Sequence, residues 1–179
     1  TPSEFSLIVC RPIWSEVGFQ VLKEARVIKD FGPRPWEIDP YLKQGGYEAL
    51  KACATKWTRD EIIAEIKKAG MRGRGGAGFP TGIKWEKVLH HRVPEHYFVC
   101  NAGEHEPGTF KDRHLLKTNP HQLLEGALIA AFTVKAKASF VYVNHEYVEE
   151  LANLRKAAEQ ARAHGFLGKN VLGTGVDLE

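Results

Sequence analysis

Glycines gather in one stretch near the middle of the sequence, beside basic side chains. Residues 70–82 hold six of the seventeen glycines of the chain, namely Gly70, Gly73, Gly75, Gly76, Gly78 and Gly82. Removing Cβ atoms at this density lets successive backbone N–H groups converge on an anion, or lets a flat ring approach the main chain. Arg72, Arg74 and Lys84 add positive charge that suits a phosphate. The stretch therefore predicts a loop that cradles a phosphate.

Two common nucleotide-binding motifs do not explain this loop. Three of its glycines satisfy the letters GxGxxG, but the dinucleotide-binding motif must follow a strand, and here a helix that ends at Gly70 comes first. The P-loop motif fails too, because no glycine is followed by Lys and then Ser or Thr. A surface turn that binds nothing is the other alternative. Phe79 and Trp85 argue against it, since large aromatics rarely flank a loop that packs on nothing.

Polar and acidic side chains form a second candidate stretch, residues 101–113. It follows residues 97–100, whose β-branched and aromatic content predicts a buried strand. Ligands of α/β proteins bind at the carboxyl ends of parallel strands, so this stretch is predicted to form the second half of the site. Asn101, Glu104 and Glu106 suit polyol and amide partners such as a ribityl chain, a ribose or a carboxamide.

Two other interpretations of residues 101–113 stay open. A solvated charged turn is one. A metal site is the other, although its candidate ligands have no firm spacing on one face of a predicted helix. Those candidates are Glu104, His105, Glu106, Asp112 and His114.

Local signals set the expected elements. Thr58 with Glu61 three residues on predicts a capping box, for a helix that Gly70 ends. Asn119 followed by Pro120 predicts the start of a buried apolar helix that runs to about residue 132. A short helical stretch is expected over residues 47–53, a second strand over 139–143, and an amphipathic helix over 147–163. Strand, helix, strand and helix in this order predict an α/β fold with a parallel βαβα layer.

The chain is expected to divide into two parts. Residues 1–40 read as an amino-terminal arm that is extended, with a possible short helix over 17–26, because the Gly and Pro residues of 31–35 break any regular element. Residues 41–179 form the α/β domain, which begins with short helices before the glycine loop. The approach to a strand over 173–179 indicates that the domain is incomplete and continues beyond this chain.

Composition bounds the class of protein. The chain has 179 residues, of which 43% are hydrophobic and 26% charged, and this balance is typical of a soluble globular protein. The net charge of +3 is too small to indicate nucleic-acid or membrane-surface binding by itself. Three widely spaced cysteines, with no export signal, fit a reducing compartment and no disulfide framework. No apolar run approaches the roughly 20 residues that a membrane-spanning helix needs.

Three stretches carry a resemblance to a known family. Residues 73–82 with Lys84 and Trp85, residues 101–113, and residues 165–170 together resemble the flavoprotein subunit of respiratory complex I. The same family includes the diaphorase subunits of NAD-linked hydrogenases and formate dehydrogenases. The resemblance covers about residues 41–179 and the amino-terminal portion of that subunit.

The resemblance implies an FMN-binding oxidoreductase module. Such a module accepts a hydride from NADH and passes electrons to iron–sulfur clusters in a multi-subunit complex. The glycine loop would hold FMN and NADH, Phe79 would stack on the adenine of NADH, and Lys84 would reach the flavin. Asn101 and Glu104 would bind the flavin side, and Glu106 the nicotinamide nucleotide. The loop residues that would hold the cofactors are Gly73, Arg74, Gly75, Gly76 and Gly78.

The resemblance also implies where the module works. Its partners would be the other electron-transfer subunits of a complex, with a [4Fe-4S] cluster in the continuation of the subunit. The module would be soluble, or lie in a peripheral arm on the cytoplasmic or matrix side, with no direct membrane insertion and no nucleic acid. No catalytic side chain and no metal ligand are assigned within this chain.

Several departures from the family pattern favour alternatives. Gly103 stands where the family usually has Asp, Lys87 where complex I members have an aromatic, and residues 144–147 replace a common Arg-Gly-Glu-Tyr. These changes favour an FMN electron-transfer subunit that uses a donor or acceptor other than NADH. A subunit that has kept the fold but lost the cofactor is another alternative. RNA binding has thin support from one Arg-Gly-Gly unit and five residues, Lys67, Lys68, Arg72, Arg74 and Phe79.

Overall fold

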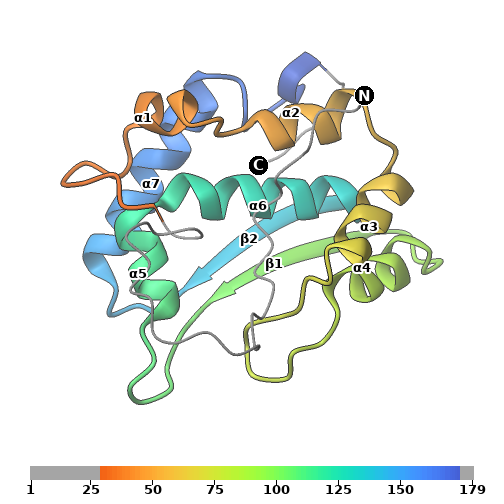
Figure 1. The fold of residues 1–179 in the computed structure, drawn as a ribbon, viewed down its shortest axis with the longest axis horizontal. Helices are drawn as coiled ribbons and strands as arrows, with labels where there is room; N and C mark the ends of the chain where they lie inside the picture. The colour runs from red at the N-terminus through yellow and green to blue at the C-terminus, as the bar shows by residue number, and fades with distance from the viewer. Residues whose placement is uncertain (1–28, 174–179) are drawn as a thin grey trace, which may run out of the picture.

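The computed structural model describes residues 29–173. The possible helix over 17–26 and the expected approach to a strand after 173 lie outside these residues. Figure 1 shows the order of the elements. They are α1 (Ile38–Lys43), α2 (Glu48–Thr55), α3 (Arg59–Lys68), α4 (Thr81–Leu89), β1 (His96–Ala102), α5 (Lys111–Thr118), α6 (Pro120–Thr133), β2 (Ala136–Val143), α7 (Val148–Ala163) and the 3-10 turn η1 (Val171–Gly173).

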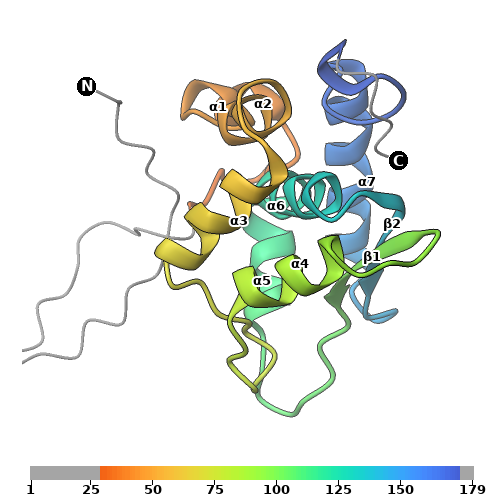
Figure 2. The ribbon, with the colours of Figure 1, turned by 90° about the vertical axis from the view of Figure 1, so that its right-hand side faces the viewer.

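The two strands form a parallel sheet. Their register runs from His96 opposite Ala136 to Ala102 opposite Val143, with one irregularity just after His96. Helix α6 crosses between them and packs on both strands, and helices α2, α3, α4, α5 and α7 pack in turn on α6 (Figures 1 and 2). The fold is thus α/β with a parallel strand–helix–strand–helix layer, as the sequence predicts.

One face of this sheet is open, which overturns the prediction of a buried strand at residues 97–100. Tyr97 and Val99 of β1 are more than half exposed, and so are Phe140 and Tyr142 of β2. Side chains alternate between the two faces of a strand, so these four residues share one face. The opposite face packs on the helices, for example through Phe98. The apolar composition of β1 marks a strand, but it does not tell whether one face or both are covered.

The strongest helix signals of the sequence are confirmed. The Thr58 hydroxyl accepts the backbone N–H of Glu61 at 3.3 Å, and the Glu61 carboxylate accepts the N–H of Thr58 at 2.8 Å, so α3 begins with a full capping box. Asn119 caps α6 by accepting the N–H of Gln122 at 3.2 Å. Gly70 follows α3 with a φ of +66°, a left-handed conformation that favours glycine.

Helices α1, α4 and α5 are not expected from the sequence. None of them has a side-chain cap from its own N-cap residue, so all three lack the strongest local start signal. Helix α1 extends to both sides of residue 40. Its Ile38 is buried in a core cluster with residues of α2, α6 and α7, and Phe31 packs against that cluster. Packing therefore begins before residue 41.

A buried polar network joins α1, α2 and α6. The Glu125 carboxylate accepts the hydroxyl of Tyr41 at 2.5 Å and the backbone N–H groups of Tyr47 and Leu50 at 2.9 and 3.2 Å. His121 lies 3.0 Å from the Tyr47 hydroxyl through Nδ1. Glu125 thus satisfies the free amides at the start of α2 from a distant helix, and burial raises the pKa values of both tyrosines well above their ordinary value.

Candidate functional site

The glycine loop connects α3 to α4 and is closed at its base by the main chain. The N–H of Gly73 donates to the carbonyl of Phe79, and the N–H of Thr81 donates to the carbonyl of Met71, both at 2.9 Å. The Arg72 guanidinium donates to the carbonyl of Gly78 at 3.0 Å. Arg72 therefore stabilises the loop itself, although its charge alone had suggested a phosphate ligand.

The tip of the loop is open. A Cβ built on Gly75 or Gly76 would meet no other atom within 4 Å. Gly76 has a φ of +102° and Gly78 a φ of +61°, which side-chain-bearing residues rarely adopt. The tip thus presents bare main chain, which is what a backbone cradle requires.

Helix α4, where the loop ends, is held close to α3. A Cβ on Gly82 would lie 2.6 Å from Cγ of Lys67 and 3.0 Å from its backbone nitrogen, so glycine is required for this approach. Lys67 also pairs with Glu86 of α4 at 2.5 Å. The two ends of the glycine loop are therefore anchored on two packed helices.

The acidic loop joins β1 to α5 and is held from inside by Glu104. The Glu104 carboxylate is buried, and it accepts the backbone N–H groups of Asp112 and Arg113 at 3.2 and 3.3 Å. These amides belong to the first turn of α5, which has no side-chain cap of its own. A negative charge at a helix N-terminus is favourable for both hydrogen bonding and electrostatics. Glu104 therefore folds the loop back onto the helix that follows it.

Two side chains after β2 secure the same loop. The amide of Asn144 donates to the carbonyl of Glu104 at 2.9 Å, and the Tyr147 hydroxyl lies 3.2 Å from that oxygen. Burial, together with the neighbouring Glu104 carboxylate, raises the pKa of Tyr147, so its hydroxyl stays protonated and can donate. Asn144 stands where the family pattern has Arg, whereas Tyr147 matches that pattern, and sequence reasoning assigned neither of them a role in the site.

The two loops meet around a cleft of about 550 Å³. Both loops lie at the bottom of the two ribbon views, and the acidic loop continues from the carboxyl end of β1 (Figures 1 and 2). Their residues in the wall are Arg74, Gly75, Gly76, Asn101, Gly103, Glu104, Glu106, Thr109, Lys111 and Asp112. A volume in this range is typical of small-molecule and cofactor sites, which span roughly 300–1,000 Å³.

Charges of both signs line the cleft. Arg74 comes from the glycine loop, and Lys111 from the first turn of α5. The Lys111 ammonium lies 2.7 Å from Asp112 and 3.7 Å from Glu104. Desolvation lowers the pKa of Lys111, but these two carboxylates outweigh it and raise the pKa above its ordinary value. Lys111 therefore stays charged and offsets the acidic side of the cleft.

The structure brings six of the predicted site residues together here: Arg74, Gly75, Gly76, Asn101, Glu104 and Glu106. The other four lie outside the wall. Gly73 and Gly78 belong to the closed base of the loop, Phe79 is half exposed beside them, and Lys84 is exposed on α4. Sequence reasoning did not assign Gly103, Thr109, Lys111 or Asp112 to the site, although all four fall within the acidic stretch that it singled out.

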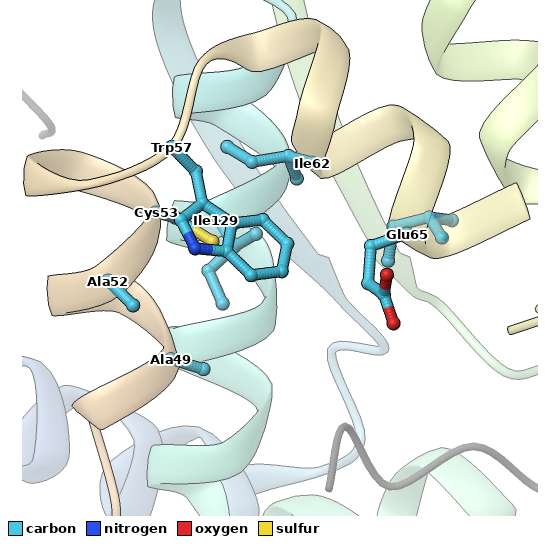
Figure 3. Close-up of a pocket in the computed structure, with 8 residues that line it drawn as sticks. Ala49, Ala52, Cys53, Trp57, Ile62, Glu65 and Ile129 are labelled. Atoms are coloured by element: carbon cyan, nitrogen blue, oxygen red, sulfur yellow. The ribbon is translucent and has the colours of Figure 1, made fainter. Parts of the chain in front are cut away.

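Four other hollows among residues 29–173 are smaller than this cleft, with volumes of about 20 to 410 Å³. A gap of about 20 Å³ between α2, α3 and α6, where Trp57, Cys53 and Ile129 gather (Figure 3), has room for little more than one water molecule. Burial raises the pKa of the Cys53 thiol to about 11, so it is unreactive at neutral pH. The described residues contain no cluster of His, Cys, Asp and Glu that could hold a metal ion. None of the helices among them is long and apolar enough to cross a membrane.

Comparison with known proteins places this site in a family. Residues 66–177, which include both loops, match the family described as the Nuo51 FMN-binding domain. An NADH-quinone oxidoreductase subunit of Aquifex aeolicus is 49% identical over 147 residues, which are 82% of this chain and 34% of that protein. The corresponding subunit of Escherichia coli is 45% identical over 82% of this chain and 33% of its own length.

Solved structures agree with this assignment. An NAD⁺-reducing [NiFe]-hydrogenase in the H₂-reduced state contains a chain that is 37% identical over 84% of this chain and 24% of its own length, with a TM-score of 0.63. In its air-oxidised state the identity is 39% over 72% of this chain and 23% of the other, with a TM-score of 0.61. The chain spans about one third of the length of the curated relatives it matches. It belongs to the family of the Nuo51 FMN-binding domain.

Proposed function

We propose that this chain is part of an FMN-binding module that accepts a hydride from NADH and passes the electrons onward within a multi-subunit complex. One observation carries the proposal: the cleft between the two loops lies entirely inside the segment that matches the FMN-binding family. The related proteins are named as NADH-quinone oxidoreductase subunits and an NAD⁺-reducing hydrogenase. We assign NADH as the donor, and partner subunits, to this chain on the basis of these related proteins.

The residues of the cleft fit FMN. Backbone amides at Gly75 and Gly76, with the guanidinium of Arg74, suit the phosphate group. Asn101 and Thr109 offer amide and hydroxyl groups for the hydroxyls of a ribityl chain. When bound, FMN supplies the chemistry that this chain's side chains lack, namely the acceptance of a hydride and the release of single electrons.

The chain's own residues position the cofactor and set the local charge. Glu104 and Asp112 would repel a phosphate, so the phosphate belongs on the side of Arg74 and the glycine loop. Lys111 offsets part of the negative charge on the acidic side, through its contacts with Asp112 and Glu104. Because Glu104, Asn144 and Tyr147 fix the acidic loop, Asn101 and Glu106 are presented from a rigid support.

Further roles follow from the family resemblance. Phe79, half exposed beside the loop, would stack on the adenine of NADH, and Glu106 would contact the nicotinamide nucleotide. Lys84 would reach the flavin, although it lies outside the cleft wall. A [4Fe-4S] cluster in another part of the protein would accept the electrons. The module would be soluble, or lie in a peripheral arm on the cytoplasmic or matrix side.

The visible absorption spectrum of the purified protein tests this function. Flavin bands are expected, together with their loss when NADH is added in the absence of oxygen. A spectrum without flavin, and no gain of flavin on incubation with FMN, would contradict the proposal and leave a fold that has lost its cofactor. Release of the bound flavin by denaturation, followed by chromatography against FMN and FAD standards, identifies the cofactor.

A second candidate keeps FMN but uses a donor or acceptor other than NADH. Lys87 favours it, because it stands exposed on α4 and offers no second aromatic face for a dinucleotide. Bleaching of the flavin by dithionite but not by NADH would support this candidate over the first.

A further inference from the structure

Gly103 lies in the wall of the cleft, and the neighbouring ring of Tyr142 leaves no room there for a larger residue. Its backbone is outside the left-handed region, unlike Gly76 and Gly78, so its conformation does not require glycine. A Cβ at this position would lie 2.2 and 2.5 Å from ring carbons of Tyr142, and 3.2 Å from Oδ1 of Asn101. Distances of 2.2 to 2.5 Å are impossible for real carbon atoms that are not bonded. The Tyr142 ring therefore occupies the space that a side chain at 103 would need.

Tyr142 borders the cleft next to Asn101 and Gly103, although it is not itself one of the residues that line it. It is the register partner of Asn101 on the neighbouring strand, and both side chains lie on the open face of the sheet. Asn101 and Gly103 line the cleft, so the Tyr142 ring extends the same surface along the sheet. The ring is 55% exposed. Among the described residues, its hydroxyl has no hydrogen-bond partner.

We infer that Tyr142 is a ligand-contacting residue of the cleft, whose ring and hydroxyl form the floor beside Asn101, and that Gly103 is present to admit this ring. The inference rests on the proposed binding of FMN. A half-exposed phenol offers an apolar face for a flat heteroaromatic ring and a donor for a ligand hydroxyl or carbonyl. The Tyr142 ring thus takes the place of a side chain at residue 103, so the floor of the cleft is aromatic and uncharged there.

Titration of the flavin-free protein with FMN, followed by flavin fluorescence, tests the inference without enzymatic activity. Tyr142→Ala is expected to weaken FMN binding about 10-fold, and Tyr142→Phe about 3-fold through the lost hydroxyl. Phe140→Ala is the matched control, because Phe140 lies two residues earlier on the same face of β2 and is 54% exposed. It is expected to change FMN affinity by less than about 2-fold.

Gly103→Ala supplies a second, independent variant. Its Cβ should displace the Tyr142 ring and weaken FMN binding to a similar extent, and adding it to Tyr142→Ala should have little further effect, because both changes remove one contact. Urea unfolding of each variant confirms that the measured protein is folded.

The outcomes distinguish failure of the proposed function from failure of the inference. If the wild-type protein binds no FMN, the proposed function fails and this inference fails with it. If the wild type binds FMN but Tyr142→Ala changes the dissociation constant by less than about 3-fold, or no more than Phe140→Ala does, the inference alone is overturned.

Discussion

The two loops that form the cleft are held in opposite ways. The glycine loop is closed by main-chain hydrogen bonds at its base, and its tip stands free of other atoms. The acidic loop is anchored through a buried carboxylate, Glu104, which reaches the first turn of α5. One loop thus depends on the absence of side chains, and the other on a particular side chain in the interior.

This difference suits two tasks. A phosphate is bound by several backbone amides, and a bare tip can adjust to it at low cost. Hydroxyl and amide groups need side chains at defined positions, which a loop fixed by buried hydrogen bonds provides. The comparison predicts that changes in the acidic loop reduce the stability of the fold, whereas changes in the glycine loop mainly reduce ligand affinity.

Glu104→Ala should give the largest effect on stability. It removes the carboxylate that accepts the amides of Asp112 and Arg113 and leaves these donors unsatisfied, so the free energy of unfolding should fall by about 2–4 kcal/mol. Glu106→Ala, in the exposed part of the same loop, is the matched control and should stay within about 0.5 kcal/mol of wild type. Urea unfolding followed by circular dichroism measures both variants. If Glu104→Ala lowered the free energy of unfolding no more than Glu106→Ala does, Glu104 would not be what anchors the acidic loop.

Gly76→Val tests the other loop. A valine at a φ of +102° is strained, so a stability loss of about 1–2 kcal/mol is expected, smaller than that of Glu104→Ala. Its side chain would also project toward the cleft and should reduce FMN affinity at least about 10-fold in the folded protein. Gly75→Ala has no such backbone strain and serves as the stability control. Full flavin occupancy in folded Gly76→Val protein would refute the backbone cradle.

The contrast between the loops also explains what the sequence could and could not predict. Helices α3 and α6 were predictable because their caps, Thr58 and Asn119, stand beside the helix they start. Helix α5 was not, because its cap is Glu104, which lies before the first helical residue and across a loop. Helix α2 was expected from its apolar spacing, but the carboxylate that caps its start, Glu125, lies 78 residues away from Tyr47 in sequence and could not be expected. A cap supplied by tertiary structure leaves no local pattern to detect.

The same limit applies to the site. Glycine density located one loop, and polar residues after a strand located the other, since both signals are local. The roles of Asn144 and Tyr147 depend on β2 lying beside β1, which places them over the carbonyl of Glu104. The open face of the sheet depends on which helices cover it. Neither follows from residue spacing along the chain.

Tyr147→Phe should weaken the anchor of the acidic loop without removing it. The change deletes a hydroxyl that lies 3.2 Å from the carbonyl oxygen and 3.4 Å from Oε2 of Glu104, and it keeps the ring that Arg113 contacts. Loss of one such hydrogen bond should lower the free energy of unfolding by about 1 kcal/mol. The effect should become smaller in a Glu104→Ala background if both residues belong to one network, because that change removes Oε2 but keeps the backbone carbonyl. Additive losses in the double variant would separate Tyr147 from the anchor.

Arg72→Ala should have the smallest effect on stability and sharpens the comparison most directly. Arg72 and Arg74 are two residues apart in the glycine loop, yet Arg72 donates to the carbonyl of Gly78 whereas Arg74 lines the cleft. Because the Arg72 side chain is exposed, losing its hydrogen bond should lower stability by about 0.5 kcal/mol and FMN affinity by less than about 3-fold. Arg74→Ala should instead leave stability unchanged and lower FMN affinity about 10-fold, since it removes a charge-assisted contact to the phosphate. Urea unfolding and FMN titration of both variants measure the two effects. If Arg72→Ala lowered FMN affinity about 10-fold and Arg74→Ala did not, Arg72 rather than Arg74 would bind the phosphate.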